Sequence, residues 1–168
     1  FQAQGKIKYI GVSNFDVELM KRALATAAVL SLQSPLSLLN RVLQTDVLPF
    51  CQQKGIGVLA YGPLAGGILS GKYKTPTTFA KSDARSFFYQ YYQGERYKAV
   101  TRFLNDLASL GRPLDQLAIN WVRQQPAVAS VLVGCRNPQQ VERNAAATDW
   151  DLTDDQLKFI NERLPLLS

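Results

Sequence analysis

The stretch GIGVLAYGPLAGGILSGKY at residues 55–73 decides the fold. Residues 57–61 form a short apolar run that predicts a buried strand, and the glycine-rich segment 62–67 follows it directly. An amphipathic run at residues 44–54 precedes the strand and predicts a helix that Gly55 ends. A helix, a buried strand and a glycine-rich turn in this order are typical of the βα units that build a parallel sheet.

The same alternation continues on both sides of this stretch. We expect strands at residues 7–12, 29–33, 57–61 and 130–133. We expect helices after the cap Asp16, at residues 44–54, 95–110 and 114–125, from Pro138 onward, and at 154–164. A barrel needs about eight such strands to close, so four βα units make half of one. The irregular stretch at residues 62–94 is long for a connection and predicts a functional segment.

Composition narrows the function classes. A chain of 168 residues that is 46% hydrophobic can bury one core. The net charge of +6 comes from scattered Lys and Arg, so we expect no nucleic-acid partner, although an anionic cofactor remains compatible. Polar residues interrupt the apolar segment 23–39, so no membrane span is expected. Two cysteines and no export signal favour the cytoplasm.

Three longer motifs identify the family that the chain resembles. They are GKIKYIGVSNF at 5–15, the stretch at 55–73, and LAINWVRQQPAVASVLVGCRNPQQVERN at 117–144. Their order and spacing, with DWDLT at 149–153, resemble the aldo-keto reductase family. The resemblance implies an α/β fold of the (β/α)8 TIM barrel type, with residues 1–168 supplying strands five to eight and a C-terminal helix. The chain would then be the C-terminal half of an NADP-dependent oxidoreductase domain.

The resemblance also implies what the chain lacks. Members of the family reduce small-molecule carbonyl substrates with an Asp, Tyr, Lys and His tetrad carried by the first four strands, and this sequence contains no histidine. No residue of this chain is therefore assigned as catalytic, no metal is expected, and the partner implied is an N-terminal half-barrel. Two alternatives stay open: a cofactor-sensing regulatory subunit resembling potassium-channel beta subunits, or an inactive truncated product.

Residues at the ends of three predicted strands suit a nicotinamide. The short polar side chains of Ser13 and Asn14 can donate and accept hydrogen bonds, as a primary carboxamide requires. By resemblance they hold the nicotinamide amide with Gln33, and the ring of Tyr61 lies on the nicotinamide. A Ser-Asn turn that starts a helix, a buried structural Gln and a core Tyr are the alternatives.

The glycine-rich turn and the last predicted βα junction suit the rest of NADPH or NADP. Small residues let backbone amides approach a diphosphate, and the resemblance assigns this role to Gly62, Pro63, Leu64, Gly66 and Lys72. A flexible connector is the alternative.

Asn137 and Pro138 are good first residues of a helix, whose N-terminus favours anions. By resemblance to the family, Arg136 would stack on adenine or meet a 2′-phosphate there. The residues implied to bind the adenosine end are Gly134, Arg136, Gln140, Arg143 and Asn144. A capped surface helix is the alternative. The aromatic residues 87–92 are either core or part of a substrate loop.

Overall fold

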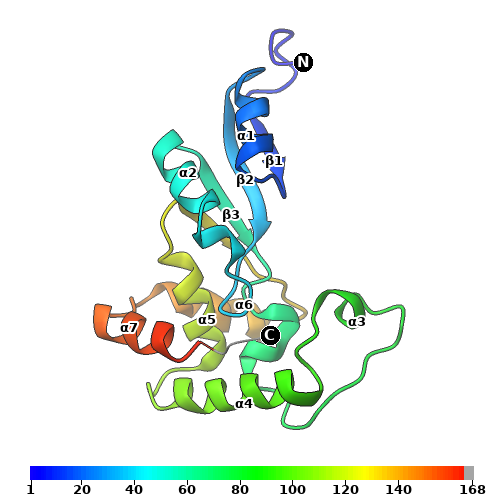
Figure 1. The fold of residues 1–168 in the computed structure, drawn as a ribbon, viewed down its shortest axis with the longest axis vertical. Helices are drawn as coiled ribbons and strands as arrows, with labels where there is room; N and C mark the ends of the chain where they lie inside the picture. Colours follow the sequence, from blue (N-terminus) through cyan, green and yellow to red (C-terminus); the bar gives the residue numbers. More distant parts are fainter. Residues whose placement is uncertain (165–168) are drawn as a thin grey trace.

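Four strands form one parallel sheet in the computed structural model, which describes residues 1–164. The strands are β1 (Ile10–Ser13), β2 (Val29–Pro35), β3 (Gly57–Tyr61) and β4 (Val128–Leu132), paired in that order. The helices are α1 (Val17–Leu24), α2 (Val47–Lys54), α3 (Arg85–Phe88), α4 (Gly94–Ala108), α5 (Leu114–Arg123), α6 (Pro138–Ala145) and α7 (Asp154–Glu162). Short 3-10 segments are η1 (Val42–Gln44), η2 (Ala65–Ser70) and η3 (Ala146–Thr148). The carboxyl ends of the strands point toward the end of the molecule that holds α4 and α5 (Figure 1).

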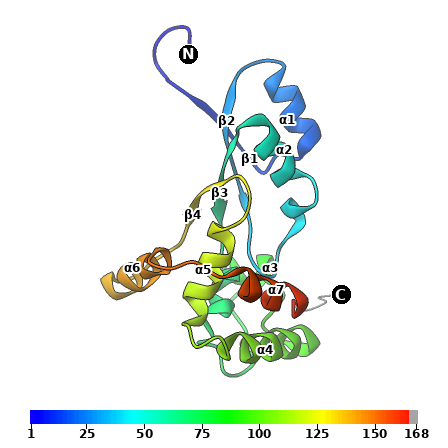
Figure 2. The same cartoon turned by 90° about the vertical axis from the view of Figure 1, so that its left-hand side faces the viewer.

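The sheet has one covered face and one open face. Leu32 of β2 pairs in register with Val58 of β3, and both side chains are fully buried. Helices α1 and α2 lie along one side of the sheet (Figure 2). On the other face, Leu132 of β4, which pairs in register with Tyr61, is 39% exposed. Within residues 1–164, β1 and β4 each pair with a strand on one side only. The layering is therefore that of an opened barrel wall.

The central strand agrees with the sequence, whereas the ends of the other strands differ. Strand β3 covers the predicted residues. Strand β1 begins at Ile10 rather than residue 7 because only β2 lies beside it, and the preceding Tyr9 is 73% exposed. Strand β4 begins at Val128, where it meets Val58, and ends one residue earlier than predicted. Strand β2 continues to Pro35, so Gln33 lies before its end.

Helix starts follow the capping signals closely. The Asp16 carboxylate accepts a hydrogen bond from the backbone amide of Leu19 at 2.8 Å. Thr153 and Gln156 form the reciprocal capping box at the start of α7. Gly55 ends α2 in the left-handed conformation with φ 67°. The prediction of one helix over 44–54 was wrong at its start, because η1 precedes α2 and α2 begins at Val47.

The predicted helix ends were less accurate than the starts. Helix α4 ends at Ala108 rather than at 110, and α7 ends at Glu162 rather than at 164.

The core beneath the carboxyl ends fixes the segment that follows β3. Leu117 and Trp121 of α5 are fully buried, as their four-residue spacing predicts. Ile68 and Leu69 of η2 are buried in the same cluster. The glycine-rich turn is thus held against α5 and is more than a loose connector.

No helix within residues 1–164 is long and apolar enough to cross a membrane. The same residues contain no group of three or more His, Cys, Asp or Glu side chains arranged to hold a metal ion.

Candidate cofactor-binding site

Four predicted residues meet at the carboxyl edge of the sheet. Ser13 pairs in register with Gln33. The backbone amide of Asn14 donates to the Gln33 carbonyl oxygen at 2.9 Å. The Tyr61 hydroxyl donates to Asn14 Oδ1 at 3.1 Å. Three neighbouring strands therefore place a hydroxyl, two carboxamides and an aromatic ring around one point.

The local sequence explains how Asn14 reaches this point. Its φ of 57° lies in the left-handed region, which Asn tolerates better than most residues. This turn ends β1, and Asp16 then caps α1. The chain thus leaves the strand sharply and turns Asn14 toward Tyr61.

The exposure of these side chains distinguishes a cofactor contact from a buried structural role for Gln33. Ser13, Asn14 and Gln33 are exposed, and Tyr61 is half-buried. Gln33 is therefore no buried structural glutamine. The exposed side-chain amides of Gln33 and Asn14 and the hydroxyl of Ser13 offer donors and acceptors that match a primary carboxamide.

The turn after β3 brings its glycines and Lys72 together. Gly62 and Gly66 adopt φ of 70° and 72°, which favour glycine. Pro63 is buried and Leu64 half-buried, so both help to hold the turn. A side-chain carbon built on Gly67 would lie 3.5 Å from the ammonium of Lys72, which is exposed. The turn therefore combines small residues with a nearby exposed cation, a combination that suits a diphosphate.

Contact with Tyr89 is a second reason why these two positions require glycine, and the sequence did not reveal it. A side-chain carbon on Gly66 would lie 2.7 Å from the Tyr89 ring and 3.0 Å from the Tyr92 hydroxyl. One on Gly62 would lie 3.3 Å from the Tyr89 hydroxyl. The segment 74–93, which we call the excursion, thus lies on the glycine turn with Tyr89 as its contact.

The excursion is ordered by an Asp-Arg pair. Arg85 hydrogen-bonds both carboxylate oxygens of Asp83, donates to the Tyr73 hydroxyl at 2.8 Å, and lies 4.1 Å from the centre of the Phe79 ring. The pKa of Asp83 falls to about 2, chiefly because of Arg85, and Arg136 contributes a smaller attraction. Arg85 therefore ties the excursion to Tyr73 and holds Asp83 and Phe79 beside it.

The aromatic residues of the excursion divide between core and surface. Tyr92 is 3% exposed, whereas Phe87 is 65% and Phe88 is 78% exposed. Tyr89 and Tyr91 are half-buried. Sequence reasoning missed Asp83, Arg85 and the contact of Tyr89, although a paired Asp-x-Arg inside an aromatic segment was a usable signal.

The start of α6 gathers most of the residues predicted for the adenosine end. Asn137 Oδ1 accepts from the Gln140 amide at 2.9 Å, and Gln140 Oε1 accepts from the Arg136 amide at 2.8 Å. The Asn144 side chain donates to Cys135 Sγ at 3.2 Å. Arg136 is exposed, beside a helix N-terminus that favours anions.

Two other predicted residues have different surroundings. Gly134 is exposed and would meet nothing within 4 Å if it carried a side chain. The Arg143 guanidinium is held by Asp115 of α5 through two hydrogen bonds. That pairing gives Arg143 a structural contact that its sequence neighbours did not predict.

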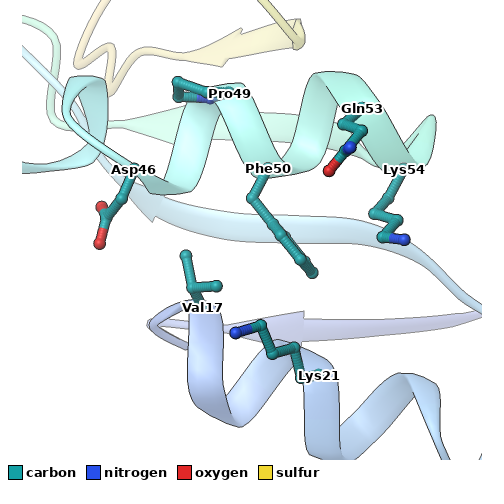
Figure 3. A pocket seen from close by; sticks show the side chains of 7 residues that line it. All are labelled: Val17, Lys21, Asp46, Pro49, Phe50, Gln53 and Lys54. Carbon is teal, nitrogen blue, oxygen red and sulfur yellow. The ribbon is translucent and has the colours of Figure 1, made fainter.

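A groove on the outer side of the sheet lies away from this edge. It runs between α1 and α2, where Lys21 and Lys54 flank Phe50 (Figure 3). None of the predicted site residues lines it. A smaller hollow is lined by Phe79, Arg85, Tyr89 and other excursion residues, and it adjoins the glycine turn. We place the candidate site at the carboxyl edge because its polar groups converge there.

A parallel sheet covered on one face, with polar groups gathered at the carboxyl ends of its strands, defines one half of a (β/α) barrel. The chain belongs to the aldo/keto reductase family, whose sequence profile matches residues 1–164.

Individual relatives place the chain within longer proteins. Aldo-keto reductase YhdN of Bacillus subtilis (strain 168) is 35% identical over 162 residues, covering 94% of this chain and 49% of its own length. The solved structure of a glycerol dehydrogenase from Gluconobacter oxydans superposes with a TM-score of 0.86 and 34% identity, covering 97% of this chain and 50% of that protein. An NADH-specific methylglyoxal reductase of Escherichia coli (strain K12) is 27% identical over 169 residues, covering 96% of this chain and 50% of its own length. The chain thus spans about half the length of these relatives, and its sheet corresponds to half of their barrels.

Proposed function

We propose that this chain forms the cofactor-binding half of an NADPH-dependent oxidoreductase that acts on aldehydes or ketones. The observation that carries the proposal is the meeting of Ser13, Asn14, Gln33 and Tyr61 at the carboxyl edge. Active sites of this barrel class form at that edge. Membership of the aldo/keto reductase family supports a nicotinamide cofactor.

The roles of the nicotinamide-binding residues follow from their chemistry. Ser13, Asn14 and Gln33 hydrogen-bond the carboxamide and so fix which face of the nicotinamide is presented. The half-buried Tyr61 ring supports the opposite face, and its hydrogen bond to Asn14 fixes the ring orientation. Bound NADPH supplies hydride to the carbonyl carbon. Fixing this geometry is the contribution of the chain to the reaction.

The remaining contacts hold the cofactor's charged groups. Backbone amides around Gly62 and Gly66, with the Lys72 ammonium, bind the diphosphate. Arg136, Gln140 and Asn144 bind the adenosine end at the start of α6. One similar protein is an NADH-specific reductase, so family membership does not choose NADPH, and the proposed choice rests on the exposed Arg136.

The proton for the carbonyl oxygen must come from outside this chain. The sequence contains no histidine, so the family tetrad cannot be assembled from its residues. We propose that an N-terminal half-barrel carries the tetrad and completes the substrate pocket. A cytoplasmic location remains a prediction from cysteine usage.

A reductase assay with a binding control tests the proposal. The purified chain is incubated with NADPH and 4-nitrobenzaldehyde, while NADPH fluorescence reports binding. We expect NADPH to bind without being oxidised, and we expect turnover when the chain is part of a polypeptide that also carries the tetrad. Failure to bind NADPH would refute the proposed function. Stoichiometric alcohol formation by the homogeneous chain would refute the division of roles.

A further inference from the structure

Helix α6 carries the proposed adenosine contacts but has almost no hydrophobic anchor. None of its residues is buried, and Val141, its apolar side chain, is 54% exposed. A helix in a globular protein normally takes its position from a buried apolar face. Something else must therefore fix how α6 presents Gln140 and Asn144.

The Asp115–Arg143 pair supplies that anchor. Asp115 lies in the first turn of α5 and is 7% exposed, on a helix whose Leu117 and Trp121 are fully buried. Arg143 Nη2 donates to Asp115 Oδ1 at 3.0 Å, and Arg143 Nε donates to Oδ2. This two-point contact between a guanidinium and a carboxylate fixes orientation as well as distance.

A third hydrogen bond joins the same two helices. Gln116 Nε2 donates to the backbone carbonyl oxygen of Arg143 at 3.0 Å. Arg143 is thus held by its side chain and by its backbone, from adjacent residues of α5. Asn144 is its neighbour in sequence, and Gln140 lies one turn earlier on the helix. A rotation of α6 about this contact would displace both.

We propose that Asp115 and Arg143 are positioning residues of the cofactor site: their ion pair sets the orientation of α6 and thereby the affinity for the adenosine end of the cofactor. The inference rests on the proposed function. As a positioning residue, Arg143 acts through Gln140 and Asn144 and affects NADPH and NADH alike. Direct binding of the 2′-phosphate by Arg143 would instead affect NADPH alone.

The first test measures cofactor affinity in three variants of the chain. Asp115→Asn, Arg143→Gln and the double variant are titrated with NADPH and with NADH. We expect each single variant to raise both dissociation constants by about tenfold, and the double variant to be no worse than either, because one contact is lost in all three. Glu142→Gln changes the charge of the neighbouring exposed residue and serves as the control with unchanged affinity.

The second test needs no cofactor. Hydrogen exchange of the free protein is followed in peptides covering residues 138–145. The Asp115→Asn variant should exchange faster there than the wild type, whereas α4 peptides should be unchanged. Arg143→Lys keeps the charge and leaves the Asp115 carboxylate paired, so it should fold normally and lie between wild type and Arg143→Gln in both tests.

The outcomes separate the two claims. A wild-type chain that binds neither cofactor refutes the proposed function and this inference with it. If the wild type binds the cofactors, and if Asp115→Asn and Arg143→Lys show wild-type affinity and wild-type hydrogen exchange, the inference is refuted while the proposed function stands. Loss of NADPH affinity only in Arg143→Gln, with Asp115→Asn unaffected, would show direct phosphate binding instead.

Discussion

At the entrance to α6, Arg136 is an exposed cation beside a capped helix N-terminus. NADPH and NADH differ by a 2′-phosphate, and a charge-assisted contact to it is worth roughly 1.5 to 3 kcal/mol, or about ten- to a hundred-fold in affinity. We expect Arg136→Ala to weaken NADPH binding by that factor and NADH binding much less. Titrations with both cofactors at low and high salt measure the effect, since screening reduces a phosphate contact.

Removal of another exposed cation provides the control for Arg136. Arg22→Ala on α1 lowers the net charge equally but lies on the covered side of the sheet, so neither affinity should change. Equal losses of NADPH and NADH affinity in Arg136→Ala would show that the guanidinium only stacks on adenine. Equal wild-type affinities for the two cofactors would contradict the preference.

The different surroundings of the two cysteines predict different thiol reactivities. Cys51 is fully buried in α2, and burial raises the pKa of its thiol, so at pH 8 less of it is the reactive thiolate. Cys135 is exposed beside Asn144. We expect Ellman's reagent to modify Cys135 faster than Cys51 by on the order of a hundred-fold, because Cys51 must await local opening.

A Cys135 variant and protection by NADPH identify which thiol reacts fast with the reagent. Cys135→Ser should remove the fast phase and leave the slow one, and saturating NADPH should slow modification of Cys135 in the wild type. Two thiols reacting at similar rates would show that α2 is not packed as described. An unprotected Cys135 at saturating NADPH would place the cofactor elsewhere.

Among the elements, those set by local signals were predictable and those set by distant contacts were not. Strand β3 has a neighbour on each side, and its predicted bounds are confirmed. The cap at Asn137 and the capping box of α7 are also confirmed, because each acts within four residues. Edge strands β1 and β4 start where a partner strand begins, which no local pattern encodes.

The contacts of the candidate site also divide into those that local sequence predicts and those that depend on distant packing. The positions of Ser13, Asn14 and Tyr61 at strand ends, together with the family resemblance, predicted them at one site, because parallel strands end at one edge. The contact of Tyr89 with Gly66 joins residues far apart in the chain, and so does the pairing of Arg143 with Asp115. Such contacts depend on side-chain packing between elements, and spacing in the sequence does not specify it.

The contact between the excursion and the glycine turn can be tested by adding one methyl group. Gly66→Ala must accept a φ of 72° and a side-chain carbon 2.7 Å from the Tyr89 ring. Gly111→Ala is the matched control, because it has a φ of 67° with nothing within 4 Å. We expect both to be destabilised by about 1 kcal/mol from the backbone, and Gly66→Ala by roughly 1 to 3 kcal/mol more from overpacking.

Urea denaturation of the two variants measures this difference in the free energy of unfolding. Faster hydrogen exchange in residues 74–93 of Gly66→Ala would locate the effect in the excursion. Equal destabilisation of both variants would mean that Tyr89 does not lie on the glycine turn.

At the scale of the whole molecule, the open face and the outer edges of β1 and β4 predict self-association. Leu132 is 39% exposed on a face that a closed barrel would cover. Unpaired edges of a parallel sheet also invite pairing with other chains. We expect the isolated chain to show concentration-dependent association in sedimentation velocity. A monodisperse monomer that unfolds cooperatively would show that these surfaces are covered in another way.

Hydrogen exchange with and without NADPH tests the central claim most directly: that the carboxyl edge of this half-barrel is a nicotinamide-cofactor site. We expect NADPH to slow exchange in the peptides covering residues 13–15, 62–72 and 134–144, while the α1–α2 groove of Figure 3 is unaffected. Exchange unchanged at saturating NADPH, or protection confined to that groove, would contradict it.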